Sequence, residues 1–179
     1  MTNYLVLTAM GADRPGIVSR LARLATDCDC DIVDSRMAIF GNEFTMIMML
    51  SGSWTSIAKI ESTIPSLSVE LDLLTVVKRT SKHTLTNFTS RLEVVFSGAD
   101  QRGTMAAITR FLADKELDLA SVKSHAESDE DDKHTQQIQV IINVPEGISA
   151  NAVTPEIEQF ALKLGLESSI KQLTKIIQE

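Results

Sequence analysis

The sequence predicts an α+β fold made of two tandem βαββαβ units. Each would be a ferredoxin-like sandwich, an antiparallel four-stranded sheet with two helices on one face. The main observation is an internal repeat: Gly11–Gly16 (GADRPG) returns as Gly98–Gly103 (GADQRG), at an offset of 98 − 11 = 87 residues. Identical residues continue at that offset outside the loop, for example Leu5 and Leu92. Strand-like and helix-like hydrophobic spacing also follows in the same order in both halves, so one unit is written twice.

The first half of the first unit shows a strand, a loop, a helix and a second strand. Every second residue over Asn3–Met10 is aliphatic and suited to burial, which predicts a strand. Apolar residues at helical spacing then predict a helix over Ile17–Ala25. Pro15 suits its first turn, where a missing N–H costs nothing. The strand Asp31–Phe40 leads into Gly41-Asn42, which is typical of a two-residue hairpin.

The second half of the first unit completes the expected order. Phe44–Ser51 is the returning strand of the hairpin. Isoleucines at i, i+3 and i+7 predict a helix over Trp54–Ile64, and Pro65 is expected to end it because proline cannot donate the helical hydrogen bond. Val69–Val77 is the expected last strand.

The second unit repeats this order, with elements expected at Arg91–Ser97, Thr104–Lys115, Leu117–Ala126, Thr135–Val144, Ala152–Leu164 and Ser168–Ile177. Ser128–His134 replaces the tight hairpin with a longer acidic loop. The final segment is ambiguous, because its apolar residues also fit one face of a helix, and only the repeat favours a strand. The stretch 79–87 is polar and aperiodic, which predicts a linker at 80–90 between a first domain at 1–79 and a second at 91–179.

Composition narrows the function classes. The net charge is −7 with a pI near 5.0, and the basic residues form no cluster, which disfavours direct binding of DNA or RNA. An RNA-recognition module would also need aromatic residues on its central strands. The longest apolar run, Met46–Leu50, is too short to span a bilayer, and the amino terminus does not resemble a signal peptide. A cytoplasmic protein is expected.

Neither an enzyme nor a metal protein is predicted. Cys28 and Cys30 lack the further pair that a zinc site requires, and the acidic run Asp129–Asp132 lacks the spacing of a calcium loop. His83, His125 and His134 (the three histidines) are not part of a recognisable nucleophile motif. No cofactor is expected.

One strand suggests a partner surface. In Phe44–Leu50 both alternating sets of residues are largely apolar, whereas Thr135–Val144 alternates apolar and polar residues. We therefore expect the first sheet to be covered on both faces, by the sister unit or by another chain, and a homo-oligomer is expected. A few tolerated exposed apolar side chains are the alternative.

The repeated loop joins the end of a strand to the start of a helix. The first N–H groups of a helix lack intrahelical partners and its dipole is positive there, so Gly16, Ile17 and Val18 could hold a carboxylate. Asp13 could accept an ammonium group, and the two together would fit an α-amino acid. A plain structural turn with a capping aspartate explains the same residues.

The stretch Asp13–Val18 (DRPGIV), set in a βαββαβ unit, resembles the ACT domain, a small module that senses amino acids. The resemblance covers nearly the whole chain. It implies ligand contacts in the first loop, at Gly11, Ala12, Asp13, Arg14, Pro15, Gly16 and Ile17. The second loop departs from the pattern because its proline is absent, so the resemblance gives weaker support for ligand contacts there, at Gly98, Asp100, Arg102 and Gly103.

The resemblance also implies a role. Paired ACT units without a further domain are similar to regulators that contact a LysR-type transcription activator instead of DNA, with glycine as the suspected ligand. The alternative is an amino-acid-sensing regulatory subunit of a biosynthetic enzyme, which would use the same ligand site. The sequence does not separate the two.

Overall fold

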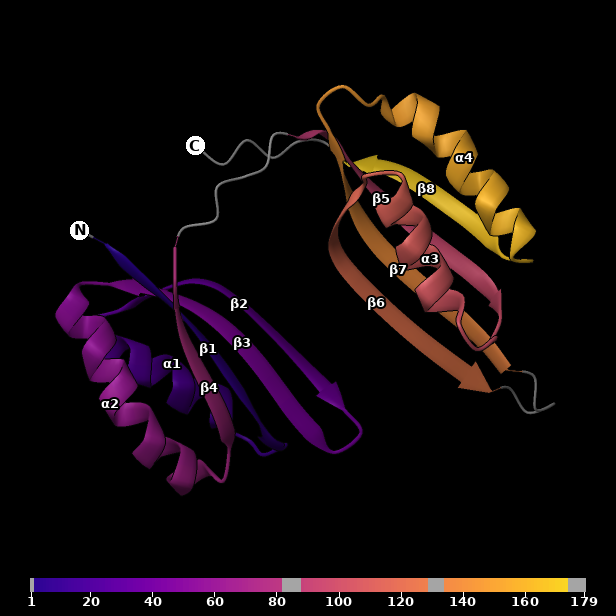
Figure 1. Ribbon diagram of the computed structural model, residues 1–179. Coiled ribbons are helices and arrows are strands. Elements are labelled where there is room, and N and C mark those ends of the chain that lie inside the picture. Colours follow the sequence, from indigo (N-terminus) through magenta and orange to yellow (C-terminus); the bar gives the residue numbers. More distant parts are fainter. Residues whose placement is uncertain (1, 82–87, 129–133, 174–179) are drawn as a thin grey trace. The chain divides into compact units, whose positions relative to one another are not determined.

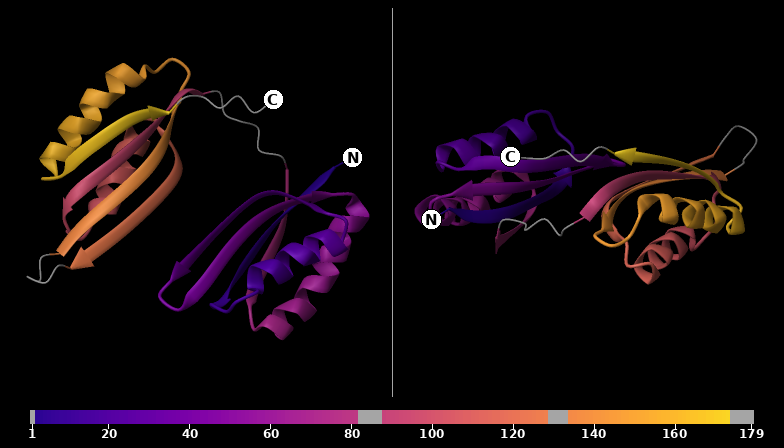
Figure 2. Two further views of the ribbon diagram at one scale, coloured as in Figure 1. Left: turned by 180° about the vertical axis from the view of Figure 1, so that it is seen from behind. Right: turned by 90° about the horizontal axis from the view of Figure 1, so that it is seen from above.

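The computed structural model describes residues 2–81, 88–128 and 134–173 (Figure 1). The chain divides into two compact units, Met1–Thr84 and Leu85–Glu179. Each has the order βαββαβ with a four-stranded antiparallel sheet, which confirms the predicted fold class. In the right-hand view of Figure 2, α3 and α4 lie against the same face of their sheet.

The first unit contains β1 (Asn3–Ala12), α1 (Ile17–Asp27), β2 (Asp31–Phe40), β3 (Glu43–Gly52), α2 (Trp54–Leu71) and β4 (Leu74–Thr80). Its strand order is β2-β3-β1-β4. The second contains β5 (Phe88–Ala99), α3 (Thr104–Asp114), β6 (Asp118–Ser128), β7 (His134–Pro145), α4 (Ala150–Lys163) and β8 (Glu167–Leu173). Its order, β6-β7-β5-β8, is the same arrangement.

Each unit has its own hydrophobic core between sheet and helices. In the first unit the alternating residues Leu5, Leu7 and Ala9 of β1 are buried, and Leu21 of α1 packs in the same cluster. A separate cluster in the second unit is built around Leu92, Val94 and other residues of β5, β7, α3 and α4. Burial of one such leucine contributes about 2 kcal/mol, so these faces are what hold the helices on the sheets.

The predicted end of the second helix is wrong. α2 continues through Pro65 to Leu71, and β4 begins at Leu74 instead of Val69. Ile64 and Leu67 are buried on either side of the proline, so core packing maintains the helical path despite the lost hydrogen bond. Val69, the expected first residue of the strand, is 83% exposed on the helix surface.

In the second unit, the start of β5 differs from the prediction, and the structure decides the type of the last segment. β5 begins at Phe88, so it includes residues 88–90 that were assigned to the linker, and Phe88 and Ser90 are both buried. The ambiguous last segment is a strand over Glu167–Leu173, paired antiparallel with β5. Residues 174–177 of the expected strand, 82–87 of the linker and 129–133 of the acidic loop lie outside the described residues.

No helix in the described part of the chain combines the length and the apolar character needed to cross a membrane.

Candidate functional site

The candidate site is the loop between β1 and α1, with its counterpart between β5 and α3. The backbone N–H of Asp13 donates to the carbonyl of Asn42 at 3.0 Å, which ties the loop to the β2–β3 hairpin. The N–H of Asp100 donates to the carbonyl of His134 at 2.9 Å in the second unit. The two loops therefore have the same backbone construction, although their sequences differ.

Gly16 and Gly103 occupy the same position, immediately before a helix. Their φ angles are 92° and 90°, in the left-handed region that favours glycine. The first helical hydrogen bonds start here, from Arg20 N–H to the Gly16 carbonyl at 3.0 Å and from Ala107 N–H to Gly103 at 2.9 Å. Neither helix has a side-chain cap, so the capping aspartate offered as the structural explanation of this loop is not observed.

Gly11 and Gly98 lie inside strands, before the turn of each loop. Gly11 lies within β1, opposite Phe44, and Gly98 lies within β5. A Cβ on Gly11 would lie 2.8 Å from the Asp72 carbonyl oxygen and 2.8 Å from Leu73 Cδ2. A Cβ on Gly98 would meet Leu166 Cδ2 at 2.7 Å. These glycines allow close packing against the chain that follows the second helix of each unit.

The Arg14 side chain is exposed and contacts the end of α2. Its guanidinium donates to the carbonyl of Leu71, at the carboxyl end of α2. A cation is favourable at this negative end of the helix dipole. Arg14 therefore connects the loop to α2, while the side chains of Asp13 and Pro15 are exposed.

The second loop is held by side chains that sequence reasoning missed. Gln136 Nε2 donates to the Ala99 carbonyl at 3.1 Å and to Thr104 Oγ1 at 2.9 Å, and Thr104 Oγ1 donates to the Gln101 carbonyl at 2.9 Å. Ile17 stands at the position of Thr104 in the first unit. In the sequence Gln136 has the same two-residue spacing as the apolar residues Ile138 and Val140, so nothing marked it as a polar contact, and its role follows only from the β5–β7 register.

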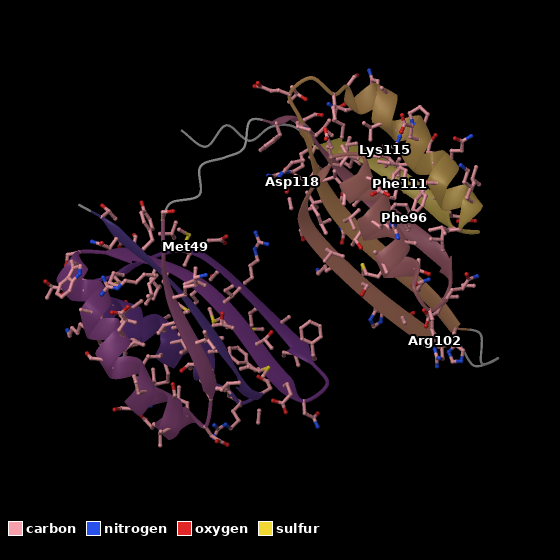
Figure 3. The ribbon with its side chains drawn as sticks, in the orientation of Figure 1. Met49, Phe96, Arg102, Phe111, Lys115 and Asp118 are labelled. Carbon is pink, nitrogen blue, oxygen red and sulfur yellow. The ribbon has the colours of Figure 1, made fainter. Side chains whose placement is uncertain are left out.

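Each unit has a shallow hollow near its sheet. One of about 310 Å³ adjoins the second loop, lined by Ser97, Gly98, His125, Glu127, Thr135, Gln136 and Gln137. Arg102 lies at this end of the second sheet (Figure 3). One of about 230 Å³ in the first unit lies on the sheet instead, lined by Val6, Asp34, Ser35, Arg36, Ile47 and Met49. The structure thus brings the predicted loop residues together but places the first hollow elsewhere.

The described residues carry no group of three or more His, Cys, Asp or Glu that could hold a metal ion. Burial raises the pKa of the Cys28 thiol and of the Cys30 thiol, which keeps both in the unreactive protonated form. Their side chains pack in the core of the first unit.

Comparison with known proteins decides the family. Residues 3–78 match the ACT domain family model. The chain is 37% identical over 169 residues to the glycine cleavage system transcriptional repressor of Escherichia coli (strain K12), covering 94% of this chain and 89% of that protein. This chain belongs to the glycine cleavage system transcriptional repressor family. The ACT-domain resemblance drawn from Asp13–Val18 is thereby confirmed.

Solved structures agree with this family assignment. The crystal structure of a candidate glycine cleavage system transcriptional repressor shares 33% identity with a TM-score of 0.77, and covers 98% of this chain and 99% of that one. A Galdieria sulphuraria protein of unknown function has a TM-score of 0.76 at 19% identity, over 97% of this chain and all of that one. The latter shows the tandem fold alone.

Proposed function

We propose that this protein is an amino-acid-responsive transcriptional regulator that acts by contact with a LysR-type activator and does not bind DNA itself. The observation that carries the proposal is the match along nearly the whole chain to a transcriptional repressor of glycine cleavage. A protein with this role works in the cytoplasm, uses no cofactor and catalyses no reaction.

The first loop has the groups needed to bind an amino acid. Val18 and Ser19 precede the first helical hydrogen bond of α1, and the Ile17 N–H lies 3.5 Å from the Arg14 carbonyl, a long contact. These N–H groups, at the positive end of the helix dipole, can bind a carboxylate. The exposed carboxylate of Asp13 is close in the chain and can accept the ammonium group. We propose glycine as the first amino acid to test.

Charge and fold support action without DNA. A net charge of −7 opposes approach to a phosphate backbone. Each of the four helices in the described residues contributes buried side chains to the core of its own unit. None is presented as an isolated basic helix for the major groove.

Calorimetric titration with glycine and a panel of other amino acids tests the sensing role. We expect one amino acid to bind at the first loop, and Gly16→Val to abolish its binding. Gly103→Val is the matched control, because it imposes the same backbone strain in the second loop. The absence of binding by every amino acid would overturn the sensing role.

Affinity capture from a cell lysate, followed by reconstitution with the purified binding protein, tests the partner. Capture of a LysR-type activator, with a complex that weakens when the amino acid is added, supports the proposal. Capture of a catalytic subunit would instead identify a regulatory subunit of a biosynthetic enzyme.

A further inference from the structure

The open face of the first sheet, meaning the face opposite α1 and α2, is unusually apolar. It is formed in the main by Val6, Met10, Ile47, Met49, Leu74 and Val76 from three neighbouring strands. Ile47 is 45% exposed, Val76 61% and Leu74 65%. Figure 3 labels Met49 on β3. Contiguous apolar patches of this kind mark protein interaction sites.

The second unit shows that the fold does not require such a face. Glu93 stands where the first unit has Val6, and Gln139 stands where it has Ile47. Gln139 Nε2 donates to Glu93 Oε1. At the same face Asn143 connects to Arg91 and Asp118, with both hydrogen bonds at 2.8 Å. The second open face is therefore polar and bonded within itself, and the apolar face of the first unit needs a different explanation.

The register of the first sheet places opposite charges at the two ends of one row of residues. Met49 pairs with Val6 and also with Asp34, and Val6 pairs with Lys78. One row across the sheet thus reads Asp34, Met49, Val6, Lys78: an acid on edge strand β2, two apolar residues and a base on edge strand β4. A two-fold axis parallel to the strands would place Asp34 of one copy over Lys78 of the other, and Met49 over Val6.

We infer that the open face of the first sheet binds the same face of a second copy of this chain, forming a two-fold symmetric dimer. Such an interface is self-complementary, as closed dimers require. Asp34 lies 3.8 Å from Arg36 of its own chain, and 61% of its side chain is exposed. Asp34 is therefore accessible to Lys78 of the other chain. The inference does not depend on the proposed regulatory function.

The size of the face sets the expected strength. Four strands about 4.8 Å apart and a span of eight residues along β3 at about 3.4 Å each give about 500 Å² per chain. The two chains together would bury about 1,000 Å², which is near the lower limit of specific interfaces. Stacked sheets are also rotated by about 30° relative to each other. The long side chain of an exposed lysine can adjust to this rotation and keep its contact. We therefore expect a reversible, concentration-dependent dimer.

Sedimentation equilibrium of the full chain over a wide concentration range, with charge-reversal variants, tests the dimer. Asp34→Lys and Lys78→Asp should each weaken dimerisation at least about tenfold, because each places like charges opposite each other. An equimolar mixture of the two variants should restore dimers close to the wild-type affinity, since each chain then supplies the charge that the other lacks. Ile47→Asp should leave only monomer.

Lys171→Asp is the matched control, because Lys171 holds the position of Lys78 in the second sheet, and it should leave dimerisation unchanged. Rescue by mixing requires that both variants fold, so it separates a lost contact from a damaged protein. A wild-type chain that stays monomeric throughout would overturn the inference. So would variants that dimerise like the wild type, or a mixture that associates no better than its components. If the wild type is a monomer and the Asp34→Lys variant no longer binds the activator, this face binds that activator instead of a second copy of the chain.

Discussion

At the residue scale, the two repeated glycine positions require glycine for different physical reasons. Gly16 and Gly103 adopt a left-handed backbone, with nothing within 4 Å of an added Cβ. Gly11 and Gly98 have ordinary backbone angles but no space for a side chain. A substitution therefore strains the backbone at the first pair and creates a clash at the second.

Gly11→Ala should destabilise the first unit by about 1–3 kcal/mol, the usual range for overpacking, because the Asp72 carbonyl is backbone and cannot turn aside. Urea denaturation measures the loss. Gly41→Ala is the comparison, because its Cβ meets nothing within 4 Å and only its φ of 62° is strained. An unchanged unfolding midpoint for Gly11→Ala would contradict the packing role.

Gly16→Val and Gly103→Val should each cost about 1–2 kcal/mol through left-handed strain. Only the first should remove amino-acid binding. Differential scanning calorimetry gives the stability effect of each, and titration calorimetry gives the affinity. Equal loss of affinity in both variants would show that the loops act together, against the assignment of the ligand to the first.

At the element scale, α2 shows how packing overrides a local signal. Pro65 removes one hydrogen bond, yet Ile57, Ile60, Ile64 and Leu67 keep one continuous buried face along the helix. The helix ends six residues later at Leu71, and the following residue, Asp72, has a φ of 52°. Arg14 and Glu61 then attach α2 to the loop and to β4.

Pro65→Ala should therefore stabilise the first unit, by up to about 3 kcal/mol, because it restores a helical N–H and removes a steric clash. Pro15→Ala should have the opposite sign, about 0.5–1 kcal/mol of destabilisation, since that proline lies before the helix and restricts the unfolded chain. Chemical denaturation of both variants provides the test. A loss of stability in Pro65→Ala would mean that the proline supports the packing.

The pair between α2 and β4 is pH-dependent. Arg79 donates two hydrogen bonds to Glu61, from Nε to Oε1 at 2.9 Å and from Nη2 to Oε2 at 2.7 Å, and this hydrogen bonding lowers the pKa of the Glu61 carboxyl below its usual value. A lowered pKa means that the stabilisation is present above the ordinary pKa and is lost as the pH falls through the lowered one. Glu61→Gln should slightly lower the melting temperature at neutral pH, with a difference that disappears in acid. A difference independent of pH would rule out the ionised pair as its cause.

At the scale of the whole molecule, two separate cores predict two unfolding events. A ligand that binds only the first unit should increase the free energy of unfolding of that unit alone, by about 2.7 kcal/mol at a ligand concentration of 100 times its Kd. Only the melting temperature of the first unit should then rise. Scanning calorimetry with increasing glycine measures this, and Gly11→Ala identifies which transition belongs to the first unit. A single transition that shifts as a whole would show that the units unfold together.

The sequence by itself determined the duplication, the βαββαβ order and the buried faces of most strands and helices. These properties depend on local periodicity and on the repeat, both of which can be read along the chain. It also located the loop of Gly11–Ile17, because its glycines recur in the second copy.

Only the tertiary structure decided the passage of α2 through Pro65, the crowding at Gly11 and the contact of Arg14 with Leu71. It also decided which residues share a row of the sheet, so that Asp34 and Lys78 became ends of one apolar row. The physical reason is the same throughout: these features depend on contacts between residues distant in the chain. Local spacing does not specify such contacts; the packing of the core and the register of the strands do.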